Sequence, residues 1–258
     1  MKTALITGAC INTGVDIVEK FLSEGYAVVF TGRNGESVKD AEASYRKKYP
    51  SASVSGYVLN SLTDSSEVDT GAVDKLFCEL DEKGIFVSTL VLNAADQGIG
   101  QKVFETPLSD FLKVINTNVV WNYYLCECAA ERMKDNGGGS ITFINSNTAY
   151  RAIPDRIAYI ASKGGQLGMM RALALDLGKY NIRVNAVLPG MIKTDRWEKN
   201  PDFYENVPSR FTPIGDVAVG ADIADAVWYF AECARNTTGA ELVVDGGNNI
   251  QLYPIIKK

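Results

Sequence analysis

Short apolar runs alternate with longer amphipathic or polar runs along the whole chain. The apolar runs, which predict buried strands, cover residues 3–7, 26–31, 54–59, 88–92, 140–144, 183–188 and 241–244. The runs between them predict helices over residues 15–24, 36–48, 67–82, 108–134, 159–180 and 221–234. Strands that alternate with helices in this way indicate an α/β fold, with a doubly wound parallel sheet, helices on both faces and right-handed crossovers.

The first strand is followed by a glycine turn that leads directly into a helix. Gly8 and Gly14 bound this turn, and the second strand ends at Gly32 and Arg33. A helix amino terminus after such a turn can hold a pyrophosphate on its exposed backbone N–H groups. An acidic residue after the second strand would favour NAD(H), whereas the planar guanidinium of Arg33 fits a 2′-phosphate. We therefore expect NADP(H) to be preferred, with NAD(H) possible; the alternative is that Arg33 is a solvated surface residue.

Tyr159 and Lys163 lie four residues apart in the helix that follows the fifth predicted strand. Residues at this spacing meet across one helical turn, so the ammonium can approach the phenol oxygen. A neighbouring cation favours the phenolate, which lowers the tyrosine pKa from about 10 and makes the phenol a usable acid or base. Ser146 follows the fifth strand at the carboxyl edge of the sheet, where open parallel sheets bind ligands. Taken alone, the pair is more often an ordinary amphipathic contact.

Three further segments place small or polar residues where a ligand could meet them. Asn93 and Ala94 follow the fourth strand, and small residues there let a ligand ring approach the backbone. Asn118 lies within the long amphipathic run, and a buried amide in a helix needs hydrogen-bond partners. Residues 191–215 are rich in charge, aromatics and proline with little periodicity, which predicts a substrate-binding loop or lid.

Composition and charge argue against several classes of function. The chain has 258 residues, 46% of them hydrophobic, and no obvious linker, so we expect a single domain over residues 1–258. A net charge of -5 with scattered basic residues argues against nucleic-acid binding. No apolar run reaches membrane-spanning length, and the amino-terminal run is too short for a signal peptide, so we expect a cytoplasmic protein. The lack of histidine excludes Ser-His-Asp and Cys-His catalysis, and the five cysteines lack metal-ligand spacing, so we expect no metal.

The order and spacing of these motifs resemble the short-chain dehydrogenase/reductase family over nearly the whole chain. The matching positions are Thr7, Gly8, Gly14, Asn93, Ala94, Asn118, Ser146, Tyr159, Lys163, Pro189, Gly190, Thr194, Asp245, Gly246 and Gly247. The resemblance implies a Rossmann-like fold and an oxidoreductase that interconverts a secondary alcohol and a ketone by hydride transfer with a nicotinamide cofactor. It also implies a homotetramer or a homodimer.

The resemblance assigns a role to each site residue. Tyr159 would exchange a proton with the substrate oxygen as general acid or base, and Ser146 would hydrogen-bond that oxygen. Lys163 would hold the nicotinamide ribose and lower the phenol pKa, and Asn118 would place a water that links Lys163 to solvent. The other cofactor contacts would come from Gly8, Asn12, Thr13, Gly14, Arg33, Asn60, Asn93, Ala94, Pro189, Gly190, Ile192 and Thr194.

The chain departs from the family pattern at three positions near the cofactor. Asn12 replaces the middle glycine of the first turn; asparagine tolerates left-handed backbone better than most residues, so we expect the turn to survive. Asn60 replaces the usual acidic residue and could accept from the adenine amino group through its carbonyl oxygen. Ile11 stands where many NADP-using members have a basic residue, which leaves the phosphate preference to Arg33.

The substrate and two other functions stay open. The predicted substrate residues are Asn147, Tyr150, Met191 and Trp197, a mixed lining that would suit a polyol, a sugar, a hydroxy-ketone or a steroid ring. A catalytically silent nucleotide-binding regulatory protein could share the fold, because a fold does not fix a function. The change at Asn12 also suggests a second alternative function, a cofactor-free lyase similar to the halohydrin dehalogenases.

Overall fold

The computed structural model describes residues 1–194, Trp197 and residues 211–252, and its strands form one seven-stranded parallel sheet. The strands are β1 (Thr3–Ile6), β2 (Ala27–Gly32), β3 (Val54–Val58), β4 (Thr89–Leu92), β5 (Gly139–Ile144), β6 (Ile182–Pro189) and β7 (Glu241–Val244). They lie in the order β3-β2-β1-β4-β5-β6-β7, and every neighbouring pair is parallel. The predicted doubly wound sheet is confirmed.

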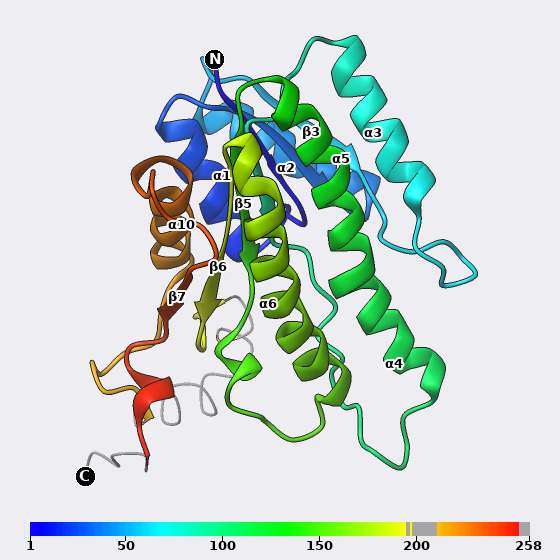
Figure 1. Cartoon of the computed structure of the whole chain (residues 1–258), viewed down its shortest axis with the longest axis vertical. Coiled ribbons are helices and arrows are strands. Elements are labelled where there is room, and N and C mark those ends of the chain that lie inside the picture. The colour runs from blue at the N-terminus through cyan, green and yellow to red at the C-terminus, as the bar shows by residue number, and fades with distance from the viewer. Residues whose placement is uncertain (195–196, 198–210, 253–258) are drawn as a thin grey trace.

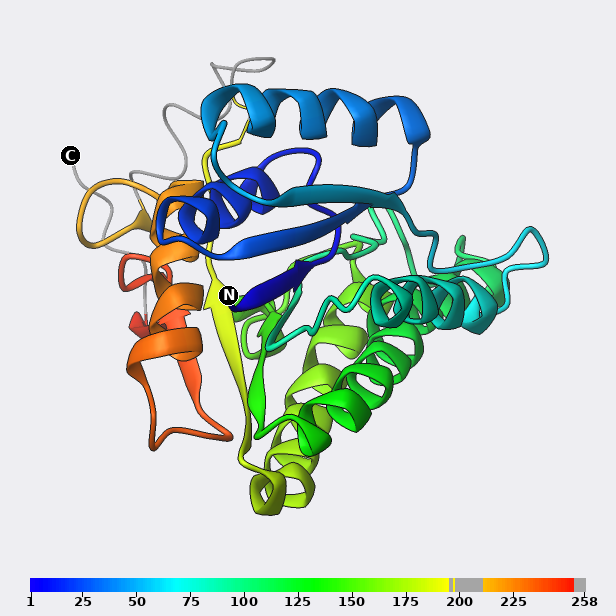
Figure 2. The ribbon, with the colours of Figure 1, turned by 90° about the horizontal axis from the view of Figure 1, so that it is seen from above.

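Helices cover both faces of this sheet, as Figure 1 and Figure 2 show. One face carries α1 (Thr13–Ser23), α2 (Gly35–Lys48) and α10 (Gly220–Trp228), and the other carries α3 (Thr70–Glu82), α4 (Leu108–Ile115), α5 (Trp121–Asp135) and α6 (Ile157–Leu177). Each layer closes its own apolar core: Phe21 and Phe230 are buried in the first, Trp121 and Phe143 in the second. Burying side chains of this size contributes about 1.5–3 kcal/mol each.

Local caps explain where two of the helices begin. The Asn34 side chain accepts the backbone N–H groups of Glu36 and Ser37, so α2 begins at Gly35. The Asp69 carboxylate accepts the N–H of Ala72 at 2.9 Å, so α3 begins at Thr70 rather than at residue 67 as predicted. In both helices the cap satisfies donors that the first turn leaves without intrahelical partners.

The predicted helix over residues 108–134 is not uniform. A π-helical turn, Asn116–Val120, separates α4 from α5, and a second one, Tyr229–Cys233, ends the predicted helix over residues 221–234. A π turn inserts one residue into a helix and is frequent at functional sites. The 3.6-residue periodicity of the sequence does not reveal a single inserted residue, so this feature was not predicted.

The carboxyl ends of all seven strands lie at one edge of the sheet. Strand order reverses beside β1, because the chain moves outward from β1 through β2 to β3 and then crosses back to β4 on the other side. Ligands bind at such a switch point in open α/β sheets. The segments that follow β1, β4, β5 and β6 are therefore where a site is expected.

Within the described residues, no helix combines the length and the apolar character needed to cross a bilayer. The same part of the chain contains no group of three or more histidine, cysteine, aspartate or glutamate side chains arranged to hold a metal ion. The five cysteines are free thiols.

Candidate active site

The turn after β1 is bonded to the segment after β4. The hydroxyl oxygen of buried Thr7 accepts the N–H groups of Asn93 (3.0 Å) and Ala94 (3.1 Å). The Asn93 side-chain nitrogen in turn donates to the backbone oxygens of Thr7 and Gly8 at 3.0 and 2.9 Å. A side chain at Gly8, which has φ +64°, would place its Cβ 2.9 Å from the Ala94 backbone. The sequence therefore located Asn93 and Ala94 correctly at this edge, but it missed Thr7 as their anchor.

Helix α1 begins inside this turn, and no side chain caps its amino terminus. A Cβ at Gly14 would lie 2.6 Å from the Gly8 oxygen, so the helix can pack this closely only because residue 14 has no side chain. Asn12 precedes the helix without capping it, and Thr13 begins the first turn. First-turn N–H groups without a side-chain cap and without a nearby Cβ form a cradle that fits a dinucleotide pyrophosphate.

Asn12 does not adopt the left-handed helical conformation that we expected. Its φ is 52° and its ψ is -143°, whereas the left-handed helical region has ψ near +47°. Positive φ with strongly negative ψ is a region that glycine occupies readily and other residues occupy with strain. The turn does survive the loss of the family glycine, as predicted, but in a strained form.

The end of β2 presents Arg33 to solvent. Within the described residues its guanidinium makes no ion pair and no hydrogen bond, so it is free to bind a phosphate. Gly32 beside it packs on the Cys10 thiol, because a Cβ there would lie 2.4 Å from the Cys10 sulfur. Ile11 and Asn60 are also exposed.

Ser146, Tyr159 and Lys163 come together where β5 ends and α6 begins. Ser146 Oγ accepts both the N–H of Thr148 at 3.1 Å and its hydroxyl at 2.9 Å. Lys163 is 2% exposed, and its Nζ lies 5.5 Å from the centre of the Tyr159 ring. The ammonium donates to the Ile144 backbone oxygen at 2.8 Å.

The electrostatics of this group differ from the expectation. Burial raises the pKa of the Tyr159 phenol, although a hydrogen bond with Ser146 and the positive charge of Arg156 oppose the rise. Burial lowers the pKa of the Lys163 ammonium to about 7. The i, i+4 spacing does bring the two side chains together, but burial outweighs the groups that lower the phenol pKa, and these groups are Ser146 and Arg156 rather than Lys163.

Asn118 lies in the π-helical turn and is fully buried. Its side chain exchanges two 2.8 Å hydrogen bonds with the backbone of Asp96 and donates to Ser162 at 2.9 Å. Its backbone oxygen accepts from the side chains of Gln166 at 2.6 Å and Asn122 at 2.9 Å. Gln166, which the sequence did not single out, therefore bonds Asn118, and its oxygen accepts from the Lys163 ammonium at 3.2 Å. A buried glutamine one turn after Lys163 is the signal that could have found it.

Pro189 ends β6, and Gly190 lies against Asp245, since a Cβ at Gly190 would be 2.6 Å from that of Asp245. Ile192 pairs with Ala218 in an isolated bridge, and its oxygen accepts the Trp197 indole N–H at 3.1 Å. Thr194 follows two residues later, and its backbone oxygen accepts the Trp197 backbone N–H at 2.8 Å. Of the predicted loop over residues 191–215, residues 195–196 and 198–210 lie outside the described part.

Two predicted substrate residues have partners on β7 or directly after it. The Asn147 side chain donates to the Asp245 carboxylate at 3.4 Å. The Tyr150 hydroxyl donates to Glu241, which also forms an ion pair with Arg171. Met191 is 41% exposed.

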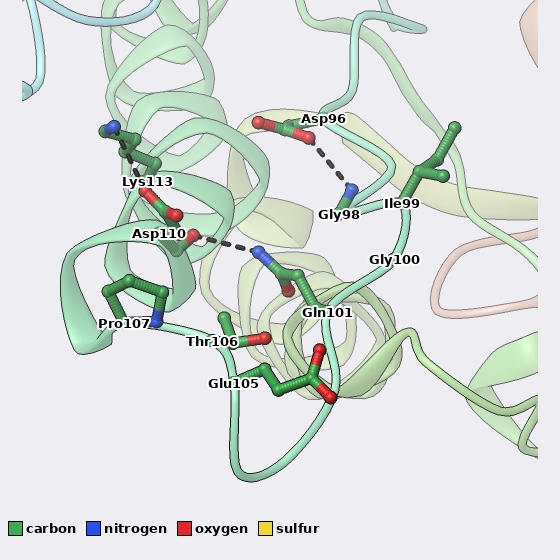
Figure 3. Close-up of a pocket in the computed structure, with 10 residues that line it drawn as sticks. All are labelled: Asp96, Gly98, Ile99, Gly100, Gln101, Glu105, Thr106, Pro107, Asp110 and Lys113. Atoms are coloured by element: carbon green, nitrogen blue, oxygen red, sulfur yellow. Dashed lines mark hydrogen bonds and ion pairs between the residues drawn. The ribbon is translucent and has the colours of Figure 1, made fainter.

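A pocket of about 370 Å³ opens beside Asp96, in the segment between β4 and α4. Figure 3 shows its lining residues: Asp96, Gly98, Ile99, Gly100, Gln101, Glu105, Thr106, Pro107, Asp110 and Lys113. Three carboxylates and one ammonium line it; Lys113 pairs with Asp110 at 3.1 Å, and Glu105 pairs with Lys102 at 3.1 Å. Asp96 belongs both to this pocket and to the hydrogen bonds of Asn118, so the pocket adjoins the candidate catalytic residues.

Proteins similar to this chain cover it almost from end to end. Residues 8–249 match a family model described as enoyl-(acyl carrier protein) reductase. The chain is 34% identical over 248 residues to a 3α-hydroxysteroid dehydrogenase of Mediterraneibacter gnavus, with 95% of this chain and 96% of the relative covered. It is 32% identical over 255 residues to an NADP-dependent (R)-specific alcohol dehydrogenase of Lentilactobacillus kefiri, with 97% of both chains covered.

Solved structures with bound nicotinamide cofactors have the same fold. ElxO with NADP bound has a TM-score of 0.85 at 29% identity, covering 97% of this chain and 99% of that one, and a tyrosine-to-phenylalanine variant of ElxO was solved with NADPH bound. NAD⁺-bound xylitol dehydrogenase has a TM-score of 0.84 at 27% identity, covering 95% of this chain and 98% of that one. These relatives support an oxidoreductase that binds a nicotinamide cofactor. The chain belongs to the short-chain dehydrogenase/reductase family.

Proposed function

We propose that this protein is an NADP(H)-preferring oxidoreductase that interconverts a secondary alcohol and a ketone, with Tyr159 as general acid or base. The observation that supports the proposal best is the meeting of Ser146, Tyr159 and buried Lys163 at the carboxyl edge of the sheet. The uncapped amino terminus of α1 lies at the same edge. A proton-exchanging group and a cofactor cradle on one edge are what hydride transfer to a carbonyl requires.

Each residue has a task that its contacts support. When bound, the cofactor supplies or accepts the hydride. Ser146 Oγ accepts two hydrogen bonds from Thr148, so its own O–H is the donor in the hydrogen bond with Tyr159 and can donate to the substrate oxygen once a substrate is bound beside that phenol. Tyr159 gives a proton to that oxygen in reduction and takes it back in oxidation.

The ionisation of the site favours ketone reduction in neutral solution. Burial raises the pKa of Tyr159, so the phenol is protonated and can donate. The hydrogen bond from Ser146 and the positive charge of Arg156 stabilise the phenolate that remains after the proton leaves. We assign the contact with the nicotinamide ribose to Lys163, because its Nζ bonds the backbone oxygen of Ile144, the last residue of β5, at the carboxyl edge of the sheet.

The preference for NADP(H) rests on Arg33. The exposed guanidinium follows β2, at the end of the βαβ unit where a dinucleotide places its adenosine ribose. A guanidinium without a carboxylate partner binds a phosphate with a planar pair of N–H donors. Both NADP-bound and NAD⁺-bound relatives exist, so the two cofactors must be compared directly.

The pocket beside Asp96 constrains the substrate. Carboxylates of Asp96, Glu105 and Asp110 line it with the Lys113 ammonium, and Glu105 pairs with Lys102. The net charge of these groups is negative, so a negatively charged substrate group is disfavoured there. Two of the relatives are named as a hydroxysteroid dehydrogenase and an alcohol dehydrogenase, and we infer an uncharged alcohol or ketone for this protein also. We further propose that residues 191–215 complete the substrate site.

We also propose that the protein is a homotetramer or a homodimer. Large apolar side chains on α4, the following π turn, α5 and the start of α6 are at least two-fifths exposed: Leu108, Leu112, Val120, Tyr123 and Ile157. Exposed apolar side chains gathered on neighbouring helices are typical of a surface that another subunit covers. Light scattering on the purified protein measures the oligomeric state, and a monomer would contradict this assignment.

Cofactor titration followed by a substrate panel tests the proposed function. Protein fluorescence is titrated with NADPH and NADH, and turnover is then followed at 340 nm with small ketones, a steroid ketone, a keto-sugar and an enoyl thioester. The proposal expects tighter NADPH binding and reduction of at least one ketone. Binding without turnover would favour the regulatory protein, and no binding of either cofactor would favour the lyase.

A further inference from the structure

The side chain of Gln166 connects three groups of the candidate active site. It is 1% exposed, and its oxygen accepts from the Lys163 ammonium at 3.2 Å and from the Asn145 amide at 3.1 Å. Its nitrogen donates to the Asn118 backbone oxygen at 2.6 Å. One amide thus spans the whole distance between Lys163 and Asn118.

The chemistry of its neighbours fixes the orientation of this amide. An ammonium can only donate and a backbone carbonyl can only accept, so the Gln166 oxygen must face Lys163 and its nitrogen must face Asn118. Asn145 agrees with this assignment, because its oxygen accepts the Ser146 N–H at 2.8 Å, which leaves its nitrogen to donate. A flipped amide would lose all three contacts.

On the basis of the proposed function, we propose that Gln166 is the positioning residue for Lys163, and that its amide, not an ordered water, joins Lys163 to Asn118. The ammonium is then held by two fixed acceptors, the Gln166 oxygen and the Ile144 backbone oxygen. A water can turn and pass a proton along, whereas an amide held at both ends cannot. The proton that Tyr159 exchanges therefore does not travel through Asn118.

The neighbours of Lys163 make its titration sensitive to residue 166. On α6, Tyr159 faces the ammonium, and Arg156 lies near the Tyr159 phenol. From β5 and the segment after it come the Ile144 backbone oxygen and the neutral Asn145, and from the π turn comes the neutral Asn118. Within the described residues no carboxylate bonds the ammonium, so a carboxylate at position 166 would be its first counter-ion.

Two substitutions change the acceptor in opposite ways. Gln166→Leu removes an acceptor of the charged amine, which favours neutral Lys163, and Gln166→Glu adds a negative charge, which favours the ammonium. In ketone reduction the rate falls as the pH rises through the pKa values of the protonated groups. The alkaline limb of the rate profile should therefore move to lower pH in Gln166→Leu and to higher pH in Gln166→Glu. Each shift should be about one pH unit, because that is the scale of one hydrogen bond to a charged group.

Asn122→Leu is the matched control. Asn122 is also a buried amide that donates to the Asn118 oxygen, at 2.9 Å, but within the described residues its side chain makes no hydrogen bond with Lys163. We expect this variant to lose thermal stability like Gln166→Leu while the alkaline limb stays in place. Suppose that Gln166→Leu and Asn122→Leu both lower the rate, and that neither Gln166→Leu nor Gln166→Glu moves the alkaline limb of the rate profile. Gln166 is then merely structural, and the proposal is wrong.

A crystal structure of the wild-type protein with NADP⁺ separates this inference from the proposed function. The proposal expects the Gln166 amide between Lys163 and Asn118 with no water bonded to both, and a water in that place in Gln166→Leu. A wild-type structure with a bridging water overturns the proposal even if ketones are reduced. A protein that binds NADP⁺ with the amide in place but reduces no ketone leaves the bridge intact and refutes the proposed function instead.

Discussion

Replacing Asn12 with glycine should stabilise the protein, because Asn12 holds a backbone conformation that glycine adopts freely. Its φ of 52° and ψ of -143° lie in a region that strains other residues by about 1–3 kcal/mol. The greater freedom of glycine in the unfolded chain offsets about 0.5–1 kcal/mol of that gain. The expected increase in the free energy of unfolding is therefore about 0.5–2 kcal/mol.

Thermal unfolding followed by circular dichroism measures this gain. For a chain of this size, 1 kcal/mol shifts the Tm by about 2–4 °C, so Asn12→Gly should raise it by about 1–8 °C. Asn181→Gly is the control, because Asn181 has φ 60° and ψ 31°, which asparagine tolerates. Its side chain also donates to the Gly137 oxygen at 2.9 Å, so that variant should be neutral or less stable.

Two results would refute the argument from strain. The first is an Asn12→Gly variant that unfolds at or below the wild-type temperature. The second is a control that gains as much as Asn12→Gly, because the gain would then come from any glycine at positive φ and not from the unusual ψ of Asn12.

Three further predictions concern the cofactor site and Lys163. Arg33→Ala should weaken NADPH binding about tenfold and leave NADH binding within about twofold in fluorescence titrations, because only NADPH carries the 2′-phosphate. Burial sets the folded-state pKa of Lys163 at about 7, below its unfolded value, so the unfolded chain holds the extra proton above pH 7. In urea denaturation, stability should therefore rise from pH 7 to 9 by up to about 1.4 kcal/mol per pH unit, and Lys163→Met should lack this contribution. Gly14→Ala should lower the free energy of unfolding by about 1–3 kcal/mol, because the new Cβ would lie 2.6 Å from the Gly8 oxygen.

Each of these predictions has a contradicting result. Equal losses of NADPH and NADH affinity in Arg33→Ala would assign Arg33 to general attraction rather than to the 2′-phosphate. The same slope of stability against pH in wild type and Lys163→Met would mean that Lys163 is not buried in its neutral form. A fully stable Gly14→Ala would show that α1 can move away from the turn.

The fold could be predicted because the apolar runs are long, regular and separated by clear breaks. All seven strands lie within two residues of their predicted bounds. Burial on both faces of a parallel sheet makes the inner strands nearly continuous apolar runs, whereas the edge strands β3 and β7 are only partly buried. The π turn at Asn116–Val120 could not be predicted, because it is stabilised by tertiary partners of Asn118 such as Asp96 and Gln166. One inserted residue leaves the hydrophobic pattern almost unchanged.

The candidate site could be predicted in its members but not in its contacts. Ser146, Tyr159 and Lys163 follow from spacing and strand ends, whereas the bridge through Gln166 depends on which buried amides meet across two helices. The pKa of Tyr159 is raised rather than lowered because the depth of burial, which the sequence does not state, outweighs a neighbouring charge. The Tyr150 hydroxyl bonds Glu241 on β7, a partner 91 residues away in the chain.

The most direct test of the account is ketone reduction by Tyr159→Phe, measured together with its affinity for NADPH. The variant keeps the ring under the Lys163 ammonium but lacks the proton, so NADPH should bind within about twofold of wild type while the rate falls about 10²–10⁴-fold. Tyr180→Phe, in the turn after α6, should keep the wild-type rate. Undiminished reduction by Tyr159→Phe, with NADPH still bound, would contradict the assignment of Tyr159 as the proton donor.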